Sequence, residues 1–127
     1  MKKGFTLVEL LAVLTVLGII ALISFPIVTN QINNSKEKSY KNQVKTIINA
    51  ANRWALANDD LLPYEDTGYD SITVYLSTLQ SNGYLQSGTV IDPRTEDVMS
   101  GCVEITYDIE YNQHNYKYIK DCDVANY

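Results

Sequence analysis

The residues with the clearest chemical potential lie at the start of the chain, in the run Lys2-Lys3-Gly4-Phe5 and at Glu9. Gly4 is a small residue between a basic leader and a long apolar segment. In an ordinary secretory signal the small-residue cleavage site follows the apolar segment. A peptidase that cuts after Gly4 would instead leave the apolar segment on the mature protein, with Phe5 as its new amino terminus.

Glu9 is the only charged residue among the 24 residues from Phe5 to Val28. A carboxylate inside a bilayer helix costs about 2.5 to 3.5 kcal/mol on insertion scales, and such groups usually have a partner or a function. The α-amino group freed at Phe5 is the nearest candidate cation. In a stack of parallel helices, the amine of one copy would pair with Glu9 of an adjacent copy and fix the stagger between them. The alternative is that Glu9 extends to the membrane interface.

The segment from residue 5 to 28 is long enough to cross a membrane. As a helix it spans roughly 36 Å at 1.5 Å per residue. Because basic residues favour the cytoplasmic side, Lys2 and Lys3 place the start of this helix at the cytoplasmic face and the rest of the chain outside. Gly18 weakens the helix, and Pro26 is expected to kink it because proline lacks an N–H and crowds the carbonyl of Leu22.

The order of these features resembles the class III leader of type IV pilins and of the pseudopilins of type II secretion and competence systems. The resemblance implies that a prepilin peptidase cuts after Gly4 and N-methylates Phe5, and that Glu9 acts in assembly. Gly18 and Pro26 fall where that family commonly has its helix-weakening residues. Further along, Tyr84-Leu85 and Asp92-Pro93 resemble a stretch of small Gram-positive pilins and pseudopilins.

The resemblance implies a non-enzymatic structural subunit of a type IV pilus-like filament, serving adhesion, motility, DNA uptake or secretion. Its partners would be other copies or related pilins, the prepilin peptidase, and an assembly platform with its ATPase. The protein would lie in the cytoplasmic membrane as a single-pass protein before assembly and in a cell-surface filament afterwards. The alternatives are a competence or secretion pseudopilin, a minor tip pilin, and a single-span anchored surface domain that never polymerises.

The rest of the chain predicts an α+β fold in four segments: leader 1–4, membrane or filament-core helix 5–28, amphipathic continuation 29–58, and an acidic globular head 59–127. In the continuation, apolar residues recur at three- and four-residue steps. In the head we expect a short helix, capped by Asp70 or Ser71, with Leu76 and Leu79 inward. The alternation over 102–111 predicts a strand that forms an antiparallel hairpin with 115–120, packed on the long helix.

Charge and composition exclude several functions. Residues 1–58 carry seven basic and two acidic side chains, whereas residues 59–127 carry three basic and thirteen acidic. An acidic head is a poor nucleic-acid binder. His114 is interpreted as a surface residue in a turn, without catalytic partners. Solvated acids are favoured over a calcium site, so no metal or cofactor is predicted; the acids concerned are Asp92, Glu96, Asp97, Asp121 and Asp123.

The two cysteines of the chain, Cys102 and Cys122, predict a disulfide, because the head lies outside the cytoplasm, where thiols are oxidised. They bracket the hairpin. If they face each other across the ladder, Ile105 lies opposite Ile119, Tyr107 opposite Lys117 and Ile109 opposite Asn115. Free thiols are the alternative in a reducing environment.

Overall fold

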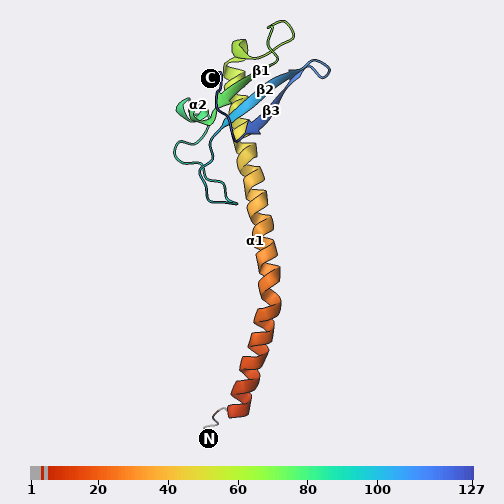
Figure 1. The fold of residues 1–127 in the computed structure, drawn as a ribbon, viewed down its shortest axis with the longest axis vertical. Helices are drawn as coiled ribbons and strands as arrows, with labels where there is room; N and C mark the ends of the chain where they lie inside the picture. Colours follow the sequence, from red (N-terminus) through yellow and green to blue (C-terminus); the bar gives the residue numbers. More distant parts are fainter. Residues whose placement is uncertain (1–3, 5) are drawn as a thin grey trace. The chain divides into compact units, whose positions relative to one another are not determined.

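A computed structural model describes Gly4 and Thr6–Tyr127. The elements in chain order are α1 (Leu7–Ala57), the 3₁₀ turn η1 (Asp59–Leu61), β1 (Ser71–Tyr75), α2 (Leu76–Ser81), β2 (Cys102–Asp108) and β3 (Gln113–Ile119) (Figure 1). The chain divides into two compact units, an N-terminal unit ending at Glu37 and a C-terminal unit of Lys38–Tyr127. The α+β fold is confirmed, with one strand more than expected. The four-segment division stays a prediction.

In the N-terminal unit, α1 is continuous through Gly18 and Pro26. Two threonine hydroxyls donate hydrogen bonds to backbone carbonyls one turn earlier in the helix. Thr15 Oγ1 donates to Leu11 O at 2.8 Å, and Thr29 Oγ1 donates to Phe25 O at 3.0 Å. Such hydroxyls satisfy their hydrogen-bonding capacity within an apolar helix without needing solvent. The kink expected at Pro26 stays a prediction.

The C-terminal unit contains a three-stranded antiparallel sheet in the order β1-β2-β3. The prediction that a helix starts at Asp70 or Ser71 is wrong, because Ser71–Tyr75 forms β1 and pairs with β2. The β-branched residues of this segment favour a strand, and Val74 lies opposite Val103 in the ladder. The short helix α2 begins five residues later, at Leu76, and it buries Leu76 and Leu79 as expected.

The hairpin of β2 and β3 forms, but its predicted register is wrong by three residues. Ile105 lies opposite Tyr116, Tyr107 opposite His114, and Cys102 opposite Ile119. The turn lies earlier in the chain than predicted, at residues 109–112, because Asp108 accepts hydrogen bonds from the amides of Glu110 and Tyr111 and Asn112 adopts a left-handed conformation, with φ at 51°. Strand β3 therefore begins at Gln113.

One face of the amphipathic part of α1 packs against the inner face of the sheet, as predicted. The buried residues on the side of α1 are Ile47, Ala50, Ala51, Trp54 and Ala55. The buried residues opposite them are Ile72, Val74, Val103 and Ile105 of the sheet and Leu79 of α2. The alanines keep the helix surface flat where it meets the sheet, so the larger side chains fill the layer between them. This layer is the core of the C-terminal unit.

Candidate functional site

The start of α1 is closed by two reciprocal hydrogen bonds between Thr6 and Glu9. The Thr6 amide donates to Glu9 Oε2 at 3.0 Å, and the Glu9 amide donates to Thr6 Oγ1 at 3.2 Å. This is a capping box, in which each side chain satisfies a backbone N–H that the helix leaves without a partner. Thr6 is a residue of this site that the leader motif does not single out, although the Thr-x-x-Glu spacing is the sequence signal for such a cap.

The capping box bears on the role predicted for Glu9. One oxygen of its carboxylate is held at the first turn of α1, where the helix dipole also favours a negative charge. The acid is therefore positioned by its own helix and does not depend on a second copy for its orientation.

The predicted cleavage and methylation site falls between Gly4 and Phe5. Gly4 is exposed, and a Cβ placed on it would have no atom within 4 Å. Phe5, Lys2 and Lys3 lie outside the described residues. Cleavage after Gly4 and methylation of Phe5 therefore stay predictions.

The apolar stretch of α1 buries nothing within its own unit. Its large side chains between Leu7 and Val28 are between 52% and 78% exposed. Within the part of the chain that the structure describes, α1 is the one helix long and apolar enough to cross a membrane. So large an apolar surface is stable only in contact with lipid or with other apolar surfaces.

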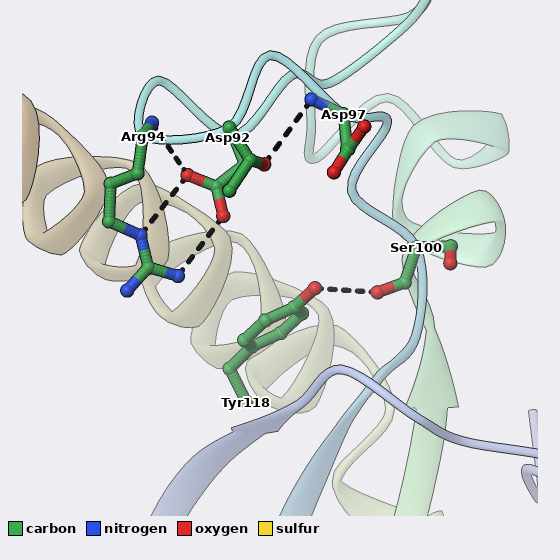
Figure 2. Close-up of polar contacts among 6 residues, drawn as sticks. Asp92, Arg94, Asp97, Ser100 and Tyr118 are labelled. Atoms are coloured by element: carbon green, nitrogen blue, oxygen red, sulfur yellow. Dashed lines mark hydrogen bonds and ion pairs between the residues drawn. The ribbon is translucent and has the colours of Figure 1, made fainter.

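In the C-terminal unit, the loop between α2 and β2 is organised by Asp92 and Arg94 (Figure 2). The carboxylate of Asp92 is buried and accepts hydrogen bonds from the Arg94 amide at 2.8 Å, Nε at 3.2 Å and Nη2 at 3.0 Å. The Arg94 guanidinium beside Asp92 holds the pKa of that carboxyl below its usual value. Arg94 also stacks on Tyr40 of α1, 3.4 Å from the ring centroid.

The same loop contains Asp92, Glu96 and Asp97, three of the five acids of the alternative calcium site; Asp121 and Asp123 follow β3. Asp92 points at Arg94, so an arginine supplies the positive charge that a cation would bring (Figure 2). Among residues 4 and 6–127, no group of three or more acidic, histidine or cysteine side chains is placed to hold a metal ion.

His114 is not the exposed turn residue that the sequence predicted. It lies in β3, is half-buried, and makes a 2.8 Å hydrogen bond through Nε2 with the carbonyl of Pro63. Its ring contacts Tyr64 edge-on at 4.9 Å and Tyr107 at 5.3 Å between centroids. The Tyr64 hydroxyl donates to Asp59, and this hydrogen bond raises the pKa of Tyr64 to about 12. His114 thus joins the loop after α1 to the hairpin.

The structure contains the predicted disulfide between Cys102 and Cys122, with the Cα atoms 5.9 Å apart. Because the register differs, Cys122 lies beyond the end of β3, and the bond anchors the last residues of the chain. The amide of Tyr75 donates to the carbonyl of Tyr127 at 2.8 Å, and the amide of Tyr127 donates to the carbonyl of Thr73 at 3.1 Å. These residues therefore cover the outer edge of β1, and the Tyr127 ring lies 5.6 Å from that of Trp54.

Comparison with known proteins identifies one segment of the chain. Residues 1–25 match the family model of the prokaryotic N-terminal methylation motif. No curated protein and no solved structure matches the chain. The motif supports a precursor of the type IV pilin or pseudopilin kind, and it covers the leader, Glu9 and most of the exposed apolar stretch of α1.

Proposed function

We propose that this chain, which carries the prokaryotic N-terminal methylation motif, is the precursor of a structural subunit of a type IV pilus-like filament. In this proposal a prepilin peptidase cuts after Gly4 and methylates the amine of Phe5. The mature protein waits in the cytoplasmic membrane with its C-terminal unit outside. An assembly platform and its ATPase then transfer α1 from lipid into a bundle of identical helices.

The observation that carries the proposal is the combination of a capped Glu9 with an apolar helix surface that its own chain does not cover. Lipid covers that surface before assembly, and neighbouring helices cover it afterwards. Because both environments are apolar, the hydrophobic free energy of α1 changes little when the helix moves from lipid into the bundle. Polar contacts therefore determine the axial position of each helix in the bundle.

Glu9 supplies such a contact. The Thr6 amide holds its Oε2. In this proposal its Oε1 accepts a hydrogen bond from the methylated amine of Phe5 in an adjacent copy. The pair would neutralise two charges that are each costly in an apolar bundle. It would also set the axial offset between subunits, because a helix that slides by one turn leaves both charges alone.

Two substitutions at Glu9 separate the charge from the cap. Glu9→Gln keeps an oxygen for the Thr6 amide but removes the charge, whereas Glu9→Val removes both. We expect both variants to insert into the membrane and neither to appear in the fibre fraction sheared from cells. Thr6→Val, which removes only the hydrogen bond to Thr6 Oγ1 and keeps the Glu9 charge, should still assemble.

The contrary results are equally specific. Normal fibre yield from Glu9→Gln would refute the intersubunit ion pair. Absence of the wild-type protein from every sheared fraction would refute the filament and favour a membrane-anchored surface domain. Intact protein in the membrane fraction, measured in the same samples, shows that a lost fibre is a loss of assembly.

A further inference from the structure

The C-terminal unit has an open groove between α1 and β3. Its volume is about 350 Å³, and its floor consists of Val44 and Ile48 from the helix with Tyr116 and Tyr118 from the strand. These four side chains are half-buried. Lys41 of the helix is exposed on its rim, whereas the Lys117 side chain, which alternates with Tyr116 and Tyr118 along β3, lies on the other face of the sheet. The groove is therefore apolar inside and positively charged at its border.

Strand β3 is one of the two edge strands of the sheet, and the groove opens along it. The opposite edge, at β1, is covered by Tyr127 of the same chain. The two edges of the sheet thus differ, since the chain covers one of them itself and leaves the other beside an apolar groove. Exposed edges of this kind are common sites of association.

A second surface has the complementary composition. The turn between β2 and β3 exposes the large apolar side chains of Ile109, at 64%, and Tyr111, at 68%. Asp108 and Glu110 alternate with them. Because the Asp108 carboxylate accepts hydrogen bonds from the amides of Glu110 and Tyr111, the turn is held in one conformation by its own residues.

We propose that the β2–β3 turn of one copy docks in the α1–β3 groove of a second copy. Ile109 and Tyr111 would enter the apolar floor, and Glu110 would face Lys41 on the rim. Both apolar character and charge are matched, and complementary charges of this kind fix the register of an interface. This inference rests on the proposed filament and names one contact between its subunits.

The geometry of the two surfaces agrees with a filament. The β2–β3 turn lies just before Gln113, at the start of β3 (Figure 1). The groove lies beside Tyr116 and Tyr118, so the two surfaces are at different positions along β3. A contact between two different surfaces is heterologous, and each added copy presents the same free surface again. Such a contact extends an array in one direction, whereas a contact between identical surfaces closes a dimer.

A charge exchange tests the docking in the full-length protein assembled by cells. Glu110→Lys places a cation against Lys41 on the rim, and Lys41→Glu places an acid against Glu110. Each single variant should reduce the sheared fibre yield about tenfold, which corresponds to a contact weakened by about 1.4 kcal/mol. The double variant restores opposite charges and should return the yield to within about twofold of the wild type.

A matched control is Glu96→Lys, which makes the same change of charge at an exposed residue of the loop between α2 and β2. It should leave fibre yield unchanged. Ile109→Ser is an independent apolar variant, and it should lower the yield without lowering the amount of protein in the membrane, because this side chain is already exposed.

The outcomes separate this inference from the proposed function. Wild-type fibres that are unaffected by either charge reversal would refute the docking and leave the filament intact. Single variants that lose fibres without rescue in the double variant would show that the two surfaces bind something other than each other, and would also refute it. Absence of wild-type fibres would refute the filament and the docking together.

Discussion

Removing the bond between Cys102 and Cys122 tests how the C-terminal unit is stabilised. The bond closes a loop of 21 residues, counted from a sequence separation of 20. In the chain-entropy model, closing such a loop restricts the unfolded chain enough to stabilise the folded state by about 3 kcal/mol. For a unit of this size, the loss corresponds to a fall in melting temperature on the order of 10 to 20 °C.

Reducing the Cys102–Cys122 disulfide has a second consequence in the structure. Cys122 is followed by the residues that cover the edge of β1, so the bond limits how far Tyr127 can move from Trp54. Trp54 is the single tryptophan of the chain and is buried. Its fluorescence therefore reports both the unfolding of the core and the loss of contact with the Tyr127 ring.

The assay is urea unfolding of the full-length protein in detergent micelles, followed by Trp54 fluorescence, with and without a reductant. Comparing oxidised and reduced forms of one sequence avoids the loss of packing that a substitution at the buried Cys102 would add. Alkylation followed by mass analysis confirms that both thiols are free in the reduced sample. An unchanged urea midpoint in a fully reduced sample would refute the argument.

Three further predictions concern single residues. Gly101→Ala should destabilise the C-terminal unit by about 2 to 4 kcal/mol in the same urea assay, because a Cβ there would lie 2.1 Å from the carbonyl oxygen of Ile119. Gly88→Ala, also at positive φ but with no atom within 4 Å, should cost less. The pKa of Asp92 is lowered on folding by Arg94, so its pairing stabilises the fold at neutral pH, and this stabilisation is lost as the pH falls through the lowered pKa. Below pH about 4 the melting temperature of the wild type should therefore fall more steeply than that of Asp92→Asn. Finally, Thr6→Ala should remove about 1 kcal/mol of capping and accelerate amide exchange at Glu9 about fivefold in micelles, whereas a rate equal to the wild type would contradict the cap.

The sequence predicts well those features that follow from long or strict patterns. The apolar run and the three- and four-residue steps correctly give α1 and its buried face. The alternation at 102–111 correctly gives β2, although the strand ends three residues earlier than predicted, at Asp108. The sequence does not predict β1, because Ile72 to Tyr75 directly precedes the helix that begins at Leu76. The predicted helix therefore starts too early and includes residues whose β-branching favours a strand.

The correct prediction of the Cys102–Cys122 disulfide does not determine the register of the hairpin between the two cysteines. Cys102 and Cys122 were placed opposite each other in the ladder, but a disulfide also joins residues where one chain has already left the sheet. The turn is determined by Asp108 and Asn112, whose side-chain and backbone conformations the alternating pattern does not contain. The cap of Thr6 on Glu9, in contrast, is a local four-residue motif that was readable from the sequence.

The most direct test of the central claim is the intact mass of the protein isolated from the cells that produce it. The account predicts a mature chain that has lost Met1 to Gly4 and carries one added methyl group, which fragmentation places on the amine of Phe5. A chain that keeps its first four residues, or one whose amino terminus lies beyond Val28, would contradict the assignment, because α1 could then not enter a filament with a free amine beside Glu9.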